Sequence, residues 1–209
     1  MKNFILAAIF ILASFFSNAQ NVQLYDENFQ AGPGLFILNG GGVGSNTGTN
    51  QWIVNSNYTA GGIYPNTISE DSTFGGSISF APYSSYLHIY DVPSGYTSCN
   101  YNPANTSDRF SYMASGFCTM GIDSISLNFF YLCEGSPTAY GTVYYSRNGG
   151  PWTQCGSPLY NNKYKWQYAS IYDPGFNNTN DLRFGFRWQN NSVAGTDTSA
   201  FAIDDIETV

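Results

Sequence analysis

Two adjacent carboxylates, Asp204 and Asp205, lie inside an apolar, strand-like run near the end of the chain. A charged side chain in such a setting costs free energy unless it is paired with a countercharge or bound to a cation. Ile203 and Ile206 are three residues apart, so a regular strand would point them to opposite faces. Either a β-bulge interrupts the strand between them, or the strand is buried on both sides. In both cases one carboxylate faces a constrained, partly dry place where a cation could bind.

Residues suited to catalysis are scarce. The single histidine, His88, lies in an alternating run and is expected to be a packed or surface strand residue rather than a general base. No serine-nucleophile, zinc-protease or phosphate-loop motif occurs in the chain. Glycoside hydrolysis needs two carboxylates, and Glu27, Glu70 and Glu134 are available, but no pattern favours a pair. We therefore interpret the protein as a non-enzyme and keep a secreted glycoside hydrolase as the less favoured alternative.

The N-terminus has the pattern of a secretion signal. Lys2 precedes an apolar run from Phe4 to Phe16 that is too short to cross a bilayer comfortably, and Ser17-Asn18-Ala19 resembles a cleavage site. Polar chain follows at once, which disfavours a membrane anchor. We expect a signal peptide over residues 1–19 and a single domain over residues 20–209, secreted or at the cell surface and without membrane insertion.

The composition favours strands and turns over helices. Only 10% of the residues are charged whereas 18% are aromatic, and the chain contains 22 glycines and 17 tyrosines. The formal net charge of −7 at pH 7 argues against nucleic acid or anionic lipid as partners. The acidic balance is compatible with cations or with neutral, hydroxyl-rich ligands.

The four cysteines are predicted to form structural crosslinks. An even number in an exported protein suggests two disulfides, and three pairings are possible. We favour Cys99–Cys118 and Cys133–Cys155, because each bridge closes a short local loop. Each would stabilise the fold by roughly 3 kcal/mol. A zinc site is disfavoured, because no Cys-x-x-Cys spacing occurs and the chain has one histidine.

The elements that must position these residues read as β-strands. In the run from Leu182 to Gln189, apolar residues alternate with arginine and glycine, which predicts a strand with one buried face. Asn148-Gly149 predicts a tight hairpin turn, and the glycine-rich stretch 39–44 predicts a long, flexible surface loop. Many strands separated by turn residues indicate a sandwich or barrel. The other expected strands are Gln23–Phe29, Gln51–Asn55, Tyr86–Asp91, Ser124–Cys133, Gly141–Ser146, Trp166–Tyr172 and Ala200–Thr208.

Several short motifs occur in a characteristic order. The most specific are the early Glu27-Asn28-Phe29, the hairpin from Val143 to Trp152, and the terminal Phe201-Ala202-Ile203-Asp204-Asp205-Ile206. In this order they resemble the cleaved-adhesin and MAM-like jelly-roll domains of secreted Bacteroidota surface proteins. The other motifs that contribute are Gly34-Leu35-Phe36, Asn50-Gln51-Trp52, Ser126–Tyr131, Trp166 and Phe184–Trp188.

The resemblance implies an all-β fold, a jelly-roll β-sandwich of two antiparallel sheets. It also implies a role in adhesion, or in binding carbohydrate or protein, often with structural calcium. In a jelly roll the first and last strands often pair, which would let Glu27 and Asp205 converge on one Ca²⁺ ion together with backbone carbonyls. The secondary candidate ligands are Asp26, Asp204 and Asn191. The alternative is that Asp204 caps a turn and Asp205 pairs with Arg183 or Arg187.

Binding is the function that the sequence favours. Exposed aromatic rings stack on sugar C–H faces, and tyrosine and asparagine hydrogen-bond hydroxyl groups. Most tyrosines, however, are expected to be sheet-surface or rim residues. The predicted partners are a glycan or an extracellular surface protein, and the alternative is a structural spacer in a larger surface protein. The candidate contact residues are Tyr140, Tyr144, Tyr160, Tyr164, Tyr168 and Tyr172.

Overall fold

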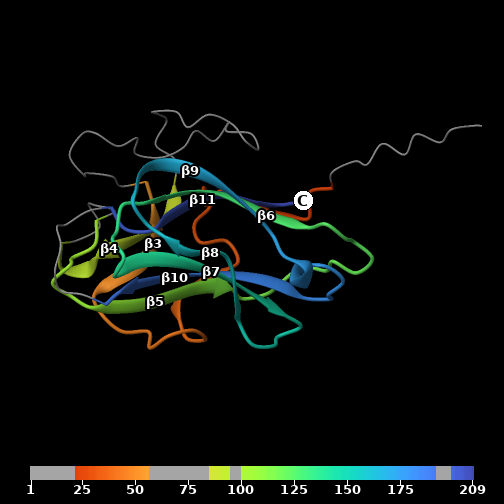
Figure 1. The fold of residues 1–209 in the computed structure, drawn as a ribbon, viewed down its shortest axis with the longest axis horizontal. Helices are drawn as coiled ribbons and strands as arrows, with labels where there is room; N and C mark the ends of the chain where they lie inside the picture. The colour runs from red at the N-terminus through yellow and green to blue at the C-terminus, as the bar shows by residue number, and fades with distance from the viewer. Residues whose placement is uncertain (1–21, 57–84, 95–99, 192–198) are drawn as a thin grey trace, which may run out of the picture.

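A computed structural model describes residues 22–56, 85–94, 100–191 and 199–209, which form two antiparallel β-sheets (Figure 1). Sheet A contains β1 (Tyr25–Glu27), β3 (Asn50–Asn55), β4 (Tyr86–Asp91), β6 (Ser126–Cys133), β9 (Lys163–Tyr172) and β11 (Ala202–Thr208). Sheet B contains β2 (Phe36–Gly40), β5 (Ser107–Met113), β7 (Ala139–Arg147), β8 (Thr153–Tyr160) and β10 (Leu182–Asn190). Two 3-10 turns, η1 (Val92–Ser94) and η2 (Pro174–Phe176), join strands. The predicted all-β class is confirmed.

The strand orders have the pattern of a jelly roll. Sheet A runs β3-β4-β11-β6-β9, with β1 also paired to β11, and sheet B runs β2-β5-β10-β7-β8. The two strand orders correspond position by position: β3 with β2, β4 with β5, β11 with β10, β6 with β7, and β9 with β8. The two strands of each such pair are consecutive in the chain, so the chain crosses from one sheet to the other between them. The predicted pairing of the first and last strands is also confirmed, with Tyr25 opposite Thr208 and Glu27 opposite Ile206.

The predicted signal peptide, residues 1–19, lies outside the described residues. Within the part of the chain that the structure describes, no helix is long and apolar enough to cross a membrane.

The core lies between the two sheets and is rich in aromatic rings. Leu182, Phe184, Phe186 and Trp188 of β10 are fully buried, which confirms the predicted alternation of this strand. Phe186 contacts Phe129 of the opposite sheet edge-on, with ring centroids 5.5 Å apart. Each large apolar side chain buried in this way contributes roughly 1.5–3 kcal/mol to folding. The other face of β10 therefore becomes the outer face of sheet B.

The sequence did not predict β2, β5 and β8. Strand β8 contains Gly156 and Pro158, two residues that disfavour a strand. They are accommodated because β8 lies at the edge of sheet B and pairs only with β7. Strand β2 is short and is followed directly by glycines, which read as loop. Strand β5 has buried residues on both faces, so its apolar residues do not alternate cleanly with polar ones.

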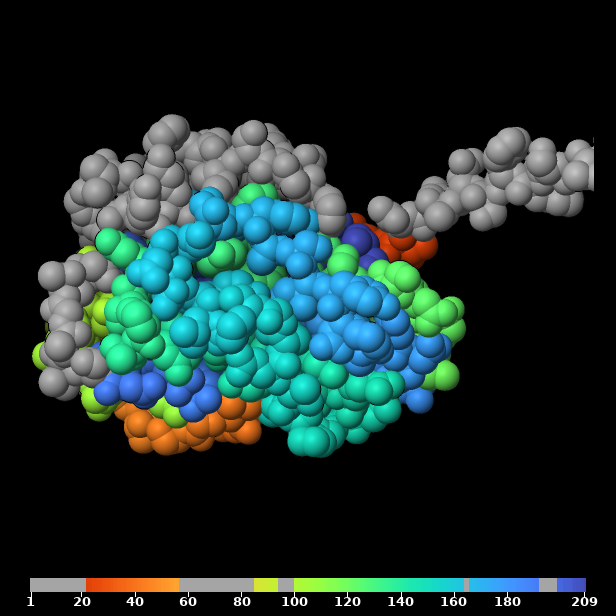
Figure 2. All heavy atoms as spheres, viewed as in Figure 1, coloured from red at the N-terminus to blue at the C-terminus, as the bar shows by residue number. Residues whose placement is uncertain are grey.

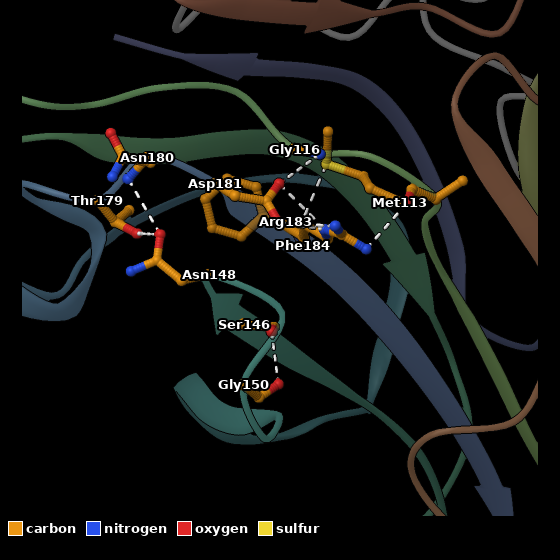
Figure 3. Close-up of polar contacts among 11 residues, drawn as sticks. Met113, Gly116, Ser146, Asn148, Gly150, Thr179, Asn180, Asp181, Arg183 and Phe184 are labelled. Carbon is orange, nitrogen blue, oxygen red and sulfur yellow. Dashed lines mark hydrogen bonds and ion pairs between the residues drawn. The ribbon is translucent and has the colours of Figure 1, made fainter.

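The β7–β8 hairpin turns at Asn148-Gly149 as predicted, and both residues have positive φ, 51° and 70°. The Asn148 side chain also links this turn to a neighbouring loop, as Figure 3 shows. Its Oδ1 accepts hydrogen bonds from Thr179 Oγ1 at 2.9 Å and from the Asn180 amide at 3.1 Å. The backbone N–H of Asn148 in turn donates to the backbone carbonyl of Asp181 at 2.8 Å.

The predicted Cys133–Cys155 disulfide is wrong, because both residues carry free thiols. Cys133 lies in β6 of sheet A opposite Lys163, whereas Cys155 lies in β8 of sheet B opposite Val143. Burial raises the pKa of the Cys155 thiol to about 12 and also raises that of Cys133.

The predicted Cys99–Cys118 bridge is also wrong, since Cys118 is a free, exposed thiol. Cys99 lies outside the described residues.

Candidate binding face

The predicted cation ligands are not brought together at one point. Asp26 lies opposite Glu207, and Glu27 lies opposite the core residue Ile206. Directly opposed residues share a face of the sheet, so Glu27 points to the core side of β1 and Asp26 to the outer side. Asn191 lies near the end of β11 that is opposite to the end paired with β1, where its backbone N–H donates to the Thr138 carbonyl.

Glu27 caps the turn that follows β1. Its Oε1 accepts the Phe29 amide at 2.8 Å, and its Oε2 fills the space where a Cβ would stand on Gly34, whose φ is +54°. Burial raises the pKa of Glu27, the hydrogen bond from Phe29 opposes that rise, and the charge of Asp26 adds to it. One of its two oxygens is therefore already used by the backbone.

Asp204 and Asp205 form a β-bulge, which is one of the two alternatives that the sequence predicts. The register with β6 shifts between Asp204 and Glu207, and Asp205 has a φ of +46°. The Asp205 amide donates to Asp204 Oδ1 at 2.9 Å, so Asp204 accepts a local hydrogen bond, as a turn-capping residue would. The bulge explains how Ile203 and Ile206 can both face the core although they are three residues apart.

The five predicted ligands do not fit a single cation centre. Glu27 and Asp26 face opposite ways, Asp204 is only 1% exposed on the outer side of β11, and Asn191 is distant. Across residues 22–56, 85–94, 100–191 and 199–209, no group of three or more His, Cys, Asp or Glu side chains is placed to hold a metal ion. Calcium binding stays a prediction.

Both arginines of β10 form ion pairs on the outer face of sheet B, so the alternative pairing of Asp205 with Arg183 or Arg187 is wrong. Arg183 binds Asp181, with Nη2 and Oδ2 2.6 Å apart. Arg187 binds Asp108 in a bidentate manner, with Nε–Oδ1 at 2.7 Å and Nη2–Oδ2 at 2.8 Å.

The outer face of sheet B combines aromatic and polar side chains, and we call this surface the binding face. Its members follow from the register, because directly opposed residues of β5, β10, β7 and β8 share a face. The first row is Tyr112, Gly185, Tyr144 and Gln154; the second is Phe110, Arg187 and Thr142; the third is Asp108, Gln189 and Tyr140; and Trp152 stands beside the first row.

The aromatic residues of the binding face form one cluster. The Trp152 ring meets Phe110 edge-on at 5.0 Å and lies 5.5 Å from Tyr112, and Tyr144 meets Phe110 edge-on at 5.7 Å. Gly185 makes this possible, since a Cβ there would collide with the Phe110 ring. Phe110 is fully buried within the cluster, whereas Trp152 and Tyr112 are half-buried.

The Asp108–Arg187 pair gives the binding face a fixed polar centre. The two side chains are only 15% and 16% exposed. Burial alone would raise the pKa of Asp108, but hydrogen bonds from Arg187 and Ser45 hold it below its usual range. Hydrogen bonding to Asp108 likewise raises the pKa of Arg187. Both groups therefore stay charged at neutral pH, and Arg187 also reaches the Tyr144 hydroxyl at 3.4 Å.

Other polar groups surround this pair. Gln189 and Tyr140 are half-buried neighbours in the third row. Thr142 lies opposite Arg187 and is 2% exposed, and its Oγ1 has no hydrogen-bond partner. With the half-buried Gln189 and Tyr140, the face can offer hydrogen bonds beside an aromatic surface.

Few of the predicted contact tyrosines belong to the binding face. Tyr144 and Tyr140 do, but Tyr160 is buried in the core. Tyr168 and Tyr172 lie on β9 of sheet A, and the side chain of Tyr164 is outside the described residues. Phe110 and Tyr112 were missed because β5 was not predicted. Besides these two tyrosines, Trp152 in the hairpin motif was a signal in the sequence for this surface.

Two of the carboxylates considered for catalysis, Glu27 and Glu134, lie far apart in the structure. Glu27 lies opposite Ile206, whereas the Glu134 amide bonds to the Ser199 carbonyl, seven residues away along the chain from Ile206. That separation is roughly 20 Å, far beyond the roughly 5–9.5 Å that glycoside hydrolysis requires. Glu70 lies outside the described residues. His88 is fully buried, and burial lowers its pKa to about 4, as suits a packed strand residue rather than a base.

No family model and no curated protein matches the chain. Comparison with solved structures does find similar folds. The chain is similar to the K1 cleaved adhesin domain of Lys-gingipain from Porphyromonas gingivalis W83, with TM-score 0.46 and 12% identity over 88% of this chain and 96% of that one. It is also similar to the CBM22-1–CBM22-2 tandem domain of Xyn10C from Paenibacillus barcinonensis, with TM-score 0.42 and 16% identity over 89% of this chain and 49% of that one. A structure of carbohydrate-binding modules from the β-sandwich superfamily gives TM-score 0.44 and 14% identity, over 87% and 60% of the two chains.

Proposed function

We propose that this protein is a non-catalytic, extracellular binding module that takes a neutral glycan on the outer face of sheet B. The observation that carries the proposal is the half-buried pair Trp152 and Tyr112, standing beside a fixed row of polar groups on one sheet face. Small ligands are generally held by an apolar or aromatic surface together with a few well-placed polar groups.

Each part of the binding face has a use in such recognition. A pyranose ring has apolar C–H faces that stack on Trp152 and Tyr112, and a hydroxyl rim that hydrogen-bonds Gln189 and the Tyr144 hydroxyl. The Asp108–Arg187 pair holds its own geometry before the ligand arrives, which lowers the entropy cost of binding. Because this pair is internally neutral and the chain carries a net charge of −7, a neutral glycan is favoured over an anionic one.

A surface protein as the partner, or a purely structural spacer, are the alternatives. The experiment is isothermal titration calorimetry of the mature domain with a panel of neutral oligosaccharides. We expect saturable binding that weakens about tenfold or more in Trp152→Ala, as for a central aromatic contact. Tyr172→Ala is the matched control, because Tyr172 is 58% exposed on β9 of the other sheet. Equal weakening by both variants, or no binding at all, would refute the proposal.

A further inference from the structure

A short segment after β2 covers part of the binding face. We call residues Gly42 to Ser45 the strap. The chain beyond it is firmly attached, since Thr47 pairs with Asp108 and the Asn46 side chain accepts from Arg109 Nη1 at 2.9 Å. In Figure 2 the orange atoms of this part of the chain border the blue and teal atoms of sheet B at the lower edge of the view. The strap therefore extends over the outer face of sheet B, and the residues that follow it are anchored to β5.

The tip of the strap packs on the aromatic cluster. A Cβ added to Gly42 would stand 3.0 Å from Trp152 Nε1 and 3.5 Å from Phe110 Cε1. Gly42 has a φ of +125° and Gly44 a φ of +75°, which other residues rarely adopt. The sequence thus uses glycine where the backbone must come closest to Trp152, in the place where a sugar ring would stack.

The other end of the strap is held by the polar centre. The Ser45 amide donates to Asp108 Oδ2 at 2.8 Å, and its hydroxyl lies 3.3 Å from the same oxygen. Gly44 packs so closely on the Asp108 carboxylate that a Cβ would collide with it. Asp108 cannot move away easily, because Arg187 holds both of its oxygens. We call these contacts of Gly44 and Ser45 with Asp108 the latch, and they include few hydrogen bonds.

We propose that the strap is self-inhibitory: its tip occupies the sugar-stacking position on Trp152, and a glycan binds fully only when the strap releases Asp108. The inference rests on the proposed function of the binding face. A closed state favoured about tenfold would weaken the apparent glycan affinity by about the same factor. Weakening the latch should therefore strengthen binding, which is the opposite of what loss of a contact residue does.

The test compares glycine substitutions. Gly44→Ala and Gly42→Ala strain the closed strap, whereas Gly41→Ala is a matched control, because a Cβ at Gly41 meets nothing within 4 Å. Gly149→Ala controls for strain alone, with its φ of +70° and open surroundings. Acrylamide quenching of tryptophan emission reports on Trp152, because Trp52, Trp166 and Trp188 are buried.

We expect both strap variants to show increased quenching and a glycan affinity several-fold higher, with the two controls unchanged. Unchanged quenching would overturn the inference, because the strap would not have released Trp152. Increased quenching with weaker glycan binding would also overturn it, since the strap would then be part of the site. Increased quenching without glycan binding in any variant would refute the glycan assignment while upholding release of the strap.

Discussion

At the scale of single residues, the Asp108–Arg187 pair links stability to the binding face. Its low exposure and bidentate geometry distinguish it from ordinary surface ion pairs, which contribute little. The pKa of Asp108 is held below its usual range in the folded state. The stability it contributes is therefore fully present above the pKa of an unfolded aspartate, about 4, and is lost as the pH falls through the lower folded value.

We predict that Asp108→Asn lowers the free energy of unfolding by about 1–3 kcal/mol at pH 7, because the charge-assisted bonds to Arg187 are weakened. The difference from the unchanged protein should shrink well below pH 4, where Asp108 becomes protonated. Urea unfolding at pH 7 and pH 3 measures this. A difference that is independent of pH would show that the asparagine acts through packing rather than through charge.

Glu27 provides the second prediction at this scale. Because its Oε1 accepts the Phe29 amide, Glu27→Ala should lower the free energy of unfolding by about 1 kcal/mol. Glu27→Gln retains an acceptor oxygen and should stay close to the unchanged protein. Thermal unfolding should give this result both in calcium and in chelator. A rise of the unfolding midpoint with calcium concentration would instead establish the predicted calcium site, provided that Glu27→Gln abolishes this rise.

At the scale of elements, the β7–β8 hairpin depends on one side chain. Asn148 tolerates its φ of 51° and braces the loop that contains Thr179 and Asn180 (Figure 3). Asn148→Ala should therefore destabilise the fold by about 2 kcal/mol, through backbone strain and the lost bonds together. Asn148→Gly removes only the brace and should cost about half as much. Equal losses in denaturant unfolding would mean that the backbone conformation contributes nothing.

The elements also show which parts of the fold the sequence predicts. Strands with a clean alternation, such as β10, and turns with a specific residue pair, such as Asn148-Gly149, were found because their signals are local. Strand β5 has buried residues on both faces and has no such signal. The disulfides were wrong for a related reason. Short spacing in sequence suggested proximity, but the jelly roll sends consecutive strands to opposite sheets.

At the scale of the whole molecule, the sandwich and the pairing of its first and last strands follow from the order of motifs, whereas the binding face does not. Phe110, Arg187 and Trp152 come from three distant parts of the chain and meet only when β5, β10 and β7 pair. A glycine-rich stretch that reads as a free loop instead packs on that face, because Ser45 reaches Asp108. Such contacts have no signature in sequence spacing.

The most direct test of the central claim is hydrogen–deuterium exchange of the mature domain with and without a saturating neutral oligosaccharide. The account predicts slower exchange in β5, β7 and β10 and around Trp152, with β9 of the other sheet unchanged. Protection on the outer face of sheet A alone, or no protection anywhere under saturation, would contradict the assignment of the outer face of sheet B as the site of binding.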